Sequence, residues 1–339
     1  MRKGETMQTT KTINLKSRPV GKPTMSDFEF ATSEVPKLKD GEVLLSTRYV
    51  SVDPYLRGRM SDAPSYIEPF QIGKPMASGI IAEVIESNHD DFKAGDFVSG
   101  MMPWKETQVL KTDGLIKVDP DKAPLSAYLG ILGMTGLTAY FGLTDIGKPK
   151  KGETLLVSGA AGAVGSVVGQ IGKILGLRVV GIAGSDEKIE MLTSDFGFDA
   201  GINYNTTDNM VKAIGQACPD GVDVYFDNVG GEISDAVLFN INKFSRTINC
   251  GAIAVYNNTE APKGISPQPF LVKNSASMQG FIIFDYVDRH AEGIRQLAEW
   301  LQQDKLKYTE TIREGFDSIP QAFLDLFKGK NKGKMVVKV

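Results

Sequence analysis

The chain has 339 residues, 42% of them apolar and 23% charged, and a formal net charge of −3. These values are typical of folded globular proteins, and the length suffices for two domains. No stretch approaches a membrane span and no basic block occurs, which argues against a membrane or a nucleic acid as the main partner. Cys218 and Cys250 cannot build a disulfide framework and, with no leader sequence before them, favour a reducing cytoplasm. Residues 1–6 are polar and are placed outside the fold.

Short apolar stretches separated by Gly and Asp turns dominate the first part of the chain, from residue 11 to about residue 124. Strands are expected at residues 42–52, 79–85, 96–100, 107–110 and 115–118. This spacing predicts a compact, barrel-like unit. A helix that begins near Leu125 then leads into the second part of the chain.

Strands and helices alternate in the second part. Six strands are expected, at residues 154–157, 178–183, 201–204, 222–228, 247–251 and 279–283, with helices near 187–195, 208–216 and 232–241. This alternation predicts a doubly wound α/β sheet whose ligand crevice lies at the carboxyl ends of its strands. Helices near 290–303 and 319–328 and a strand at 334–339 have no place in that sheet and are assigned to the first domain. The expected domains are residues 8–130, completed by 295–339, and residues 131–294.

The first strand of the expected sheet runs into a glycine turn and then into a helix with one apolar face. Ala160, Gly162 and Gly165 occupy the three positions of the Rossmann dinucleotide fingerprint, with Ala in the first position. Glycine at the other two positions lets the backbone approach a pyrophosphate, whose charge is held by free N–H groups at the helix start. A plain glycine-rich turn is the alternative. The strand at 178–183 favours the fingerprint, because it follows at the spacing that a βαβ unit needs.

The end of the second strand indicates which dinucleotide binds. An NAD site usually carries Asp or Glu there for the ribose hydroxyls, and this strand ends in Ala183, Gly184 and Ser185. Lys188 can pair with a 2′-phosphate and Ser185 can donate a hydrogen bond to it, so NADP is favoured over NAD. The alternatives are a solvated lysine and a serine that only caps the following helix.

Metal ligands are scarce in this sequence. His89 and His290 are its two histidines, neither has neighbours at metal-ligand spacing, and both are expected at the surface. We therefore expect no metal in the site. Hydride addition to a double bond conjugated with a carbonyl is then the easier reaction, because the substrate itself delocalises the developing charge into an enolate.

Seven motifs carry a family resemblance. They are VDPYLRG (52–58), GMTGLTAY (133–140), AAGAVGS (160–166), GSDEK (184–188), FDNVGG (226–231), CGAI with the following Tyr256 and Asn257 (250–257), and GKNKGK (329–334). From about residue 10 to residue 339 the chain resembles the zinc-free branch of the medium-chain dehydrogenase/reductases. Within it, the chain is similar to the NADP-dependent alkenal/one double-bond reductases, which include the leukotriene B4 12-hydroxydehydrogenase/15-oxo-prostaglandin 13-reductase group. The resemblance implies a GroES-like β-barrel domain, completed by the C-terminal tail, and a six-stranded Rossmann domain.

The resemblance also implies contacts with NADP. Those to the pyrophosphate are Gly162, Ala163, Val164 and Gly165, and those to the ribose phosphate are Lys188 and Tyr204. The remaining implied contacts are Met134, Asn228, Cys250, Gly251, Ala252, Ile253, Tyr256, Phe281, Ile282, Ile283 and Asn331, with residues 281–283 at the nicotinamide carboxamide. Each of these residues taken alone could be a turn, core or packing residue. All but Met134 and Asn331 fall at turns or strand ends of the expected sheet, and this joint occurrence favours a site.

Two tyrosines could serve a substrate. Tyr55 follows a turn fixed by proline in the first domain, and Tyr256 follows the fifth strand of the sheet. Either phenol could donate a hydrogen bond to a carbonyl oxygen, and packing is the alternative for both. Tyr256 is favoured as the catalytic residue and Tyr55 as a wall of the substrate pocket.

The expected activity is therefore NADPH-dependent reduction of the carbon–carbon double bond of α,β-unsaturated aldehydes and ketones. Hydride would reach the β-carbon without help from a metal. Quinone reduction on the same fold and NADPH binding without turnover, as in a sensor, are the alternatives. The resemblance suggests a homodimer that acts on small molecules.

Overall fold

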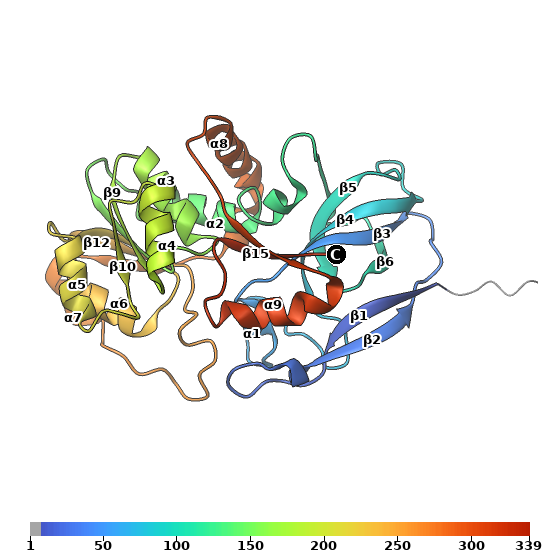
Figure 1. Ribbon diagram of the computed structural model, residues 1–339, viewed down its shortest axis with the longest axis horizontal. Helices are drawn as coiled ribbons and strands as arrows, with labels where there is room; N and C mark the ends of the chain where they lie inside the picture. The colour runs from blue at the N-terminus through green and yellow to red at the C-terminus, as the bar shows by residue number, and fades with distance from the viewer. Residues whose placement is uncertain (1–7) are drawn as a thin grey trace, which may run out of the picture. The chain divides into compact units, whose positions relative to one another are not determined.

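The computed structural model describes residues 8–339, which form two compact units (Figure 1). Unit 1 comprises the residues up to Leu129, Ile312–Lys330 and Met335–Val339, and unit 2 comprises Gly130–Thr311 and Asn331–Lys334. The polar start of the chain, residues 1–6, lies outside the described residues. No helix in residues 8–339 combines the length and the apolar character that crossing a bilayer requires.

Unit 2 is built on a six-stranded parallel sheet. Its strands are β8 (Thr154–Ser158), β9 (Arg178–Ala183), β10 (Ala200–Asn203), β11 (Val222–Asp227), β12 (Ile241–Asn249) and β13 (Ser277–Gly280). They lie in the order β10-β9-β8-β11-β12-β13, so the strand order reverses between β8 and β11. This is the order of a doubly wound dinucleotide-binding domain, which confirms the predicted fold class.

Seven helices belong to unit 2: α2 (Met134–Phe141), α3 (Gly165–Ile174), α4 (Asp186–Glu190), α5 (Met210–Ala217), α6 (Gly231–Leu238), α7 (Gln268–Asn274) and α8 (His290–Gln302). Shorter 3₁₀ or π segments cover Gly142–Gly147, Met191–Asp195 and Ile283–Arg289. Several predicted boundaries differ from the structure, and the strand expected at residues 247–251 spans Ile241–Asn249. The helix expected to end at residue 241 ends at Leu238, and the strand expected to end at residue 283 ends at Gly280.

Glycines let helix α3 pack closely on its surroundings. A Cβ atom at Gly169 would lie 1.9 Å from the ring of Phe198, and one at Gly172 would lie 2.6 Å from the side chain of Leu155 in β8. Contacts this short would force the neighbouring side chains to move, because a close-packed interior has no spare volume. The two glycines therefore set the depth at which α3, and with it the turn before α3, rests on the sheet.

The C-terminal part of the chain divides between the units, whereas the sequence analysis assigned all of residues 295–339 to the first domain. Helix α8 contacts α2, and a Cβ atom at Gly293 would lie 2.6 Å from Leu137 and 3.1 Å from Phe141. This packing holds α8 in unit 2, and the bonds of Gln170 in α3 to the backbone of Lys307 hold the chain that follows, so that unit 2 extends to Thr311. The short piece Asn331–Lys334 also belongs to unit 2.

Unit 1 carries the second large sheet, of seven strands. Its strands are β3 (Glu42–Ser51), β4 (Ala77–Ser87), β5 (Phe97–Pro103), β6 (Thr107–Lys111), β7 (Ile116–Val118), β14 (Glu310–Glu314) and β15 (Lys334–Lys338). The order is β14-β15-β3-β4-β5-β7, with β6 also paired to β3. Figure 1 shows β15, drawn in red, beside the blue strand β3, with which it pairs antiparallel. The tail thus completes a β-rich unit that fits the expected GroES-like domain.

Several elements of unit 1 have no counterpart in the predicted set. Strands β1 (Thr9–Leu15) and β2 (Phe28–Glu34) form a separate antiparallel pair, and short 3₁₀ segments cover Met25–Asp27 and Phe316–Ser318. The helix expected to begin near Leu125 is a short 3₁₀ segment, Leu125–Leu129, followed by α2. Helix α1 (Leu56–Arg59) was likewise not predicted, while α9 (Ile319–Leu326) was. The core of the unit holds the fully buried Trp104, whose indole nitrogen donates to the hydroxyl of Ser78 over 2.8 Å.

Candidate functional site

The turn between β8 and α3 has the backbone shape of a dinucleotide-binding turn. Gly159 adopts a φ of 58°, and the amide of Ala160 donates to the carbonyl of Ile182 in β9 over 3.0 Å. A Cβ atom at Gly165 would lie 2.5 Å from the carbonyl oxygen of Gly159, and one at Gly162 would lie 3.2 Å from the same atom. The turn therefore closes only with glycine at Gly165, the third position of the fingerprint.

Free donors accompany this cradle. Within residues 8–339, the amides of Ala163 and Val164 have no backbone acceptor. Both amides directly precede α3, where N–H groups and the helix dipole favour an anion. The residues present thus fit a pyrophosphate at the predicted Gly162, Ala163, Val164 and Gly165.

A segment from the far end of the chain lies against the same turn. The amide of Gly333 donates to the carbonyl of Ala161 over 2.8 Å, and Gly333 forms a parallel bridge with Gly162. Within this segment the amide of the Asn331 side chain donates to the carbonyl of Gly333 over 2.9 Å. The fold thus brings Asn331, another predicted site residue, to the dinucleotide turn.

The end of β9 gathers three more predicted residues. Ser185 caps α4, because its hydroxyl accepts a hydrogen bond from the amide of Lys188 over 3.3 Å. A Cβ atom at Gly184 would lie 2.6 Å from the phenol oxygen of Tyr204, so that hydroxyl lies directly over the strand end. Lys188 is half-buried, and burial, followed by the positive charge of Lys332, lowers the pKa of its ammonium. Lysine, serine and tyrosine here fit a 2′-phosphate.

The carboxylates near this strand end have partners of their own. Asp186 accepts a hydrogen bond from the Asn203 side chain over 2.7 Å, and Glu187 forms an ion pair with Lys332. Both acids lie beyond the strand end, in the first turn of α4. The sequence analysis did not identify the contact between Glu187 and Lys332, since the two residues are 145 positions apart.

A buried carboxylate that the sequence analysis missed holds the end of β11. Asp227 is 4% exposed, and its side chain accepts hydrogen bonds from five donors, which are the hydroxyls of Ser158, Tyr225 and Ser234 and the amides of Val229 and Gly230. The next residue, Asn228, donates from its side chain to the carbonyl of Ser158 over 2.8 Å. Asp227 therefore positions the turn that carries the predicted Asn228. The motif FDNVGG was the only signal of it in the sequence.

Residues 250–256 fold back over the ends of β11 and β12. The amides of Cys250 and Gly251 both donate to the carbonyl of Asp227, over 2.9 and 3.1 Å, and the amide of Ile253 donates to that of Asn228 over 3.5 Å. The phenol oxygen of Tyr256 accepts a hydrogen bond from the amide of Ala252 over 3.1 Å. All the predicted residues of this segment thus lie at the carboxyl ends of β11 and β12.

The titratable groups of this segment stay protonated at neutral pH. Burial is the main cause that raises the pKa of Tyr256, opposed by the hydrogen bond from Ala252. Burial also raises the pKa of the Cys250 thiol to about 12, with a contribution from the charge of Asp227. Tyr256 therefore offers an O–H donor, whereas Cys250 is no thiolate nucleophile.

The remaining predicted residues lie elsewhere. Phe281, Ile282 and Ile283 follow β13, and the ring of Phe281 reaches to 2.7 Å from the Cβ position of Gly142. Met134 begins α2 and is not at a strand end. Tyr55 belongs to unit 1, where its buried hydroxyl has no hydrogen-bond partner among the described residues. Burial and the neighbouring Asp53 raise its pKa, so this phenol too keeps its proton.

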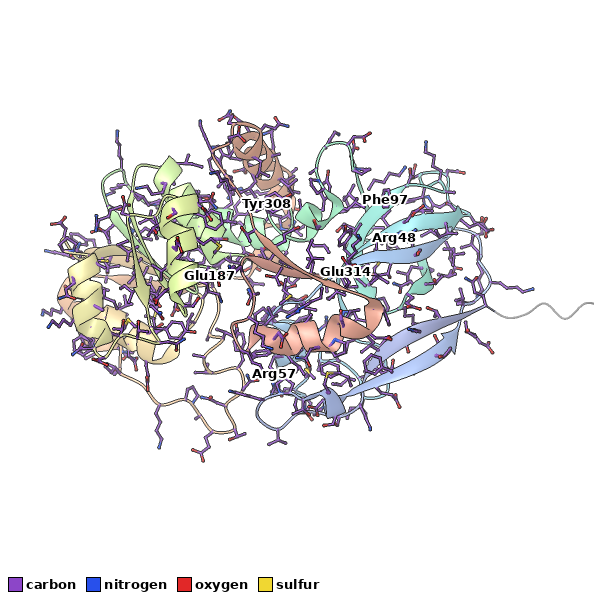
Figure 2. The ribbon with its side chains drawn as sticks, viewed as in Figure 1. Arg48, Arg57, Phe97, Glu187, Tyr308 and Glu314 are labelled. Atoms are coloured by element: carbon purple, nitrogen blue, oxygen red, sulfur yellow. The ribbon has the colours of Figure 1, made fainter. Side chains whose placement is uncertain are left out.

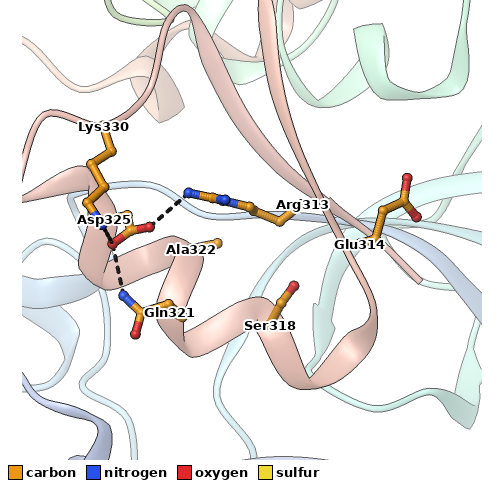
Figure 3. A pocket seen from close by; sticks show the side chains of 7 residues that line it. All are labelled: Arg313, Glu314, Ser318, Gln321, Ala322, Asp325 and Lys330. Carbon is orange, nitrogen blue, oxygen red and sulfur yellow. Dashed lines mark hydrogen bonds and ion pairs between the residues drawn. The ribbon is translucent and has the colours of Figure 1, made fainter.

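The cavity shown in Figure 3 lies in unit 1, and none of the predicted site residues lines it. Its volume is about 460 Å³. Asp325, 2% exposed, accepts ion pairs from Arg313 at 3.0 Å and from Lys330 at 3.2 Å. The charge of Asp325 is thus met by two cations within the cavity wall.

Among residues 8–339, no three His, Cys, Asp or Glu side chains come together as a metal would require. His89 and His290, expected at the surface, are both partly exposed.

Two families of known proteins match the chain. Residues 11–118 match the family described as the N-terminal domain of oxidoreductase, and residues 163–303 match the one described as zinc-binding dehydrogenase. The two matches fall on the β-rich first part of the chain and on the doubly wound sheet.

Curated relatives cover nearly the whole chain. The Bacillus subtilis protein YfmJ, an inferred NADP-dependent oxidoreductase, is 59% identical over 96% of this chain and 97% of its own length. The NADPH-dependent curcumin reductase of Escherichia coli is 44% identical over 99% of both chains. The NADP-dependent 2-alkenal reductase of Nicotiana tabacum is 41% identical over 97% of both.

A solved structure supports the same assignment. The crystal structure of CurA from Vibrio vulnificus in complex with NADPH superposes with a TM-score of 0.93, at 43% identity over 97% of this chain and 99% of that one. Fold, motifs and relatives agree, and the chain belongs to the zinc-free branch of the medium-chain dehydrogenase/reductases, in the family of NADP-dependent alkenal/one double-bond reductases.

Proposed function

We propose that this protein is an NADPH-dependent reductase of the carbon–carbon double bond of α,β-unsaturated aldehydes and ketones. The proposal rests on the carboxyl ends of the strands of unit 2. There a dinucleotide turn, a lysine suited to a 2′-phosphate and a protonated phenol follow strands of one sheet. The relatives support it, since curcumin reductase and 2-alkenal reductase both use NADP(H).

The cofactor would be held along these strand ends. The turn at residues 162–165 would hold the pyrophosphate, and Ser185, Lys188 and Tyr204 the 2′-phosphate. A 2-alkenal carries its double bond next to an aldehyde, so the relative's substrate is a conjugated carbonyl compound. When bound, NADPH supplies a hydride, which we assign to the β-carbon of such a substrate. The electrons of the double bond would then form a bond between the α-carbon and the carbonyl carbon, and those of the carbonyl bond would move to its oxygen. The resulting enolate would take a proton at the α-carbon from an acid or from water and regain its carbonyl group.

Tyr256 is the group that we assign to the carbonyl oxygen. Its own oxygen already accepts the amide of Ala252, and this bond fixes the phenol and makes its O–H a stronger donor. The raised pKa keeps the O–H in place at neutral and mildly alkaline pH. A donor aimed at an oxygen that gains negative charge stabilises the transition state more than the ground state. Tyr55, whose buried hydroxyl has no partner among residues 8–339, keeps its proposed place in the substrate pocket.

The first prediction concerns the reaction itself. With NADPH deuterated at the transferring position and an enone as substrate, the label should appear at the β-carbon, and the α-hydrogen should come from solvent. NADH should be poorer by about one to two orders of magnitude in kcat/KM, the value of a charge-assisted hydrogen bond. Mass spectrometry and NMR of the product measure both labels.

The same assay separates the alternatives. Chelators should leave turnover intact, because no step is assigned to a metal. Deuterium on the carbinol carbon of an allylic alcohol would overturn the proposed reaction. Turnover of quinones but not of enones would favour quinone reduction, and stoichiometric NADPH binding without oxidation would favour a sensor.

The second prediction concerns Tyr256→Phe. The variant keeps the ring but loses the O–H donor, so kcat should fall by about 10- to 100-fold while the KM for the enone changes little. The substitution also removes the acceptor of the Ala252 amide, and the KM for NADPH therefore serves as the control for the 250–256 segment. An unchanged kcat, or a loss confined to the KM for NADPH, would reduce Tyr256 to a packing residue.

We propose further that two copies of the chain associate through the β13 edge of the unit 2 sheet. All four residues of this edge strand are exposed, and so is Val272 of the preceding α7, at 81%. An unpaired strand edge next to an exposed apolar residue is a ready surface for a second copy. Light scattering should report a dimer that Val272→Asp converts to monomer. Ile116→Asp, at an exposed apolar position of unit 1, is the matched control, and a wild-type monomer would refute the proposal.

Both cysteines are unpaired, Cys218 buried and Cys250 partly so. Free thiols agree with the proposed location in a reducing cytoplasm. Fractionation of cells against a cytoplasmic marker tests this location.

A further inference from the structure

Lys332 belongs to a segment whose backbone is held beside the proposed cofactor site by several hydrogen bonds. Its amide donates to the hydroxyl of Thr311 over 2.9 Å, and that hydroxyl donates back to the carbonyl of Lys332 over 2.9 Å. The next residue, Gly333, bonds to Ala161 in the dinucleotide turn. At Gly333 φ is 61°, and a Cβ atom would lie 1.8 Å from the carbonyl oxygen of Thr309. Lys332 therefore starts from a fixed point beside the turn.

The side chain of Lys332 extends from this point to helix α4. It forms an ion pair with Glu187, which is labelled in Figure 2 and directly precedes Lys188. Lys332 is close enough to Lys188 for the two positive charges to repel each other. Two cations thus converge on one turn, in which Glu187 is the acid that meets Lys332.

The two lysines at this turn would be stabilised more by a bound dianion than by Glu187 alone. Glu187 is 71% exposed and can be hydrated when Lys332 leaves it. A phosphate of about two negative charges between the lysines would replace their repulsion by attraction to both. A ribose hydroxyl at the same place would give no such gain.

We propose that Lys332 is a second cation for the 2′-phosphate of NADPH, alongside Lys188, and that it exchanges Glu187 for the phosphate when the cofactor binds. The inference rests on the proposed function, because it assumes an NADPH site at the end of β9. It makes the segment 331–334 a determinant of the choice between NADPH and NADH. Glu187 becomes a competitor that weakens this choice.

Substitutions of Lys332 and Glu187 distinguish a phosphate-binding role of Lys332 from a purely structural one, because the two roles predict effects of different sign on phosphate binding. If Lys332 binds the phosphate, removing Lys332 weakens phosphate binding while removing the charge of Glu187 strengthens it. If the ion pair only braces α4 against the segment 331–334, both substitutions weaken binding, because each breaks the same brace.

The test uses the full chain and two small probes, adenosine 2′,5′-bisphosphate and AMP, which differ only in the 2′-phosphate. By isothermal titration calorimetry, Lys332→Ala should weaken bisphosphate binding by about three- to tenfold, a reduced value because the side chain is 37% exposed. AMP binding should change by less than about twofold. Glu187→Gln should strengthen bisphosphate binding, and both effects should shrink as salt is added.

Lys330→Ala is the matched control. It removes the same charge from the same stretch of chain, but its ammonium pairs with Asp325 in unit 1 (Figure 3), so bisphosphate binding should not change. An unchanged ratio of the two affinities in Lys332→Ala would overturn the inference. A loss of binding in Glu187→Gln would overturn it as well.

Lys188→Ala distinguishes this inference from the proposed function. If the wild type prefers the bisphosphate and Lys188→Ala alone abolishes the preference, the proposed cofactor stands and only the role of Lys332 falls. If the wild type binds both probes equally, the proposed choice of NADPH fails, and the inference fails with it.

Discussion

The carboxylate of Asp227 ties together the strand ends on which the site is built. The buried carboxylate accepts hydrogen bonds from the hydroxyl of Ser158 at the end of β8, from the amides of Val229 and Gly230 in the turn after β11, and from Ser234 in the following helix. The backbone carbonyl of the same residue accepts the amides that follow β12. A charge removed from water is tolerated only when its lone pairs are met by donors, and five donors meet them here. Because these donors come from β8, from β11 and its turn, and from α6, satisfying the charge also fixes where these elements lie relative to one another.

Features with a local cause were the ones that the sequence predicted well. The six strands of unit 2 and the glycine turn follow from apolar runs, helical spacing and missing side chains, which are properties of neighbouring residues. The prediction of residues 162–165, 185 and 188 as cofactor contacts rests on the same kind of local pattern. Ser185 shows that two interpretations of one residue can both hold, since it caps α4 at the strand end where a phosphate would bind.

Features that depend on distant partners were missed. Strands β1 and β2 pair with each other, and β1 is also held by distant segments, since the amide of Ile13 donates to the carbonyl of Trp104 over 3.1 Å. Neither strand has a strong apolar run of its own. The contact between Lys332 and Glu187 joins residues 145 positions apart, and no motif announces it. The tail was assigned to one domain as a block because a sequence shows no sign that residues 331–334 turn back to Ala161.

The contact between residues 331–334 and Ala161 affects the order in which the protein can fold during synthesis. Unit 2 is assembled from two pieces of chain separated by a stretch of unit 1, and the second piece is synthesised after all the other residues of the unit. While the chain is still growing on the ribosome, the carbonyl of Ala161 lacks the hydrogen bond that the amide of Gly333 later donates, and the dinucleotide turn is open on that side. The nascent sheet can form early, but the turn between β8 and α3 gains its hydrogen bond from Gly333 only when that residue has emerged.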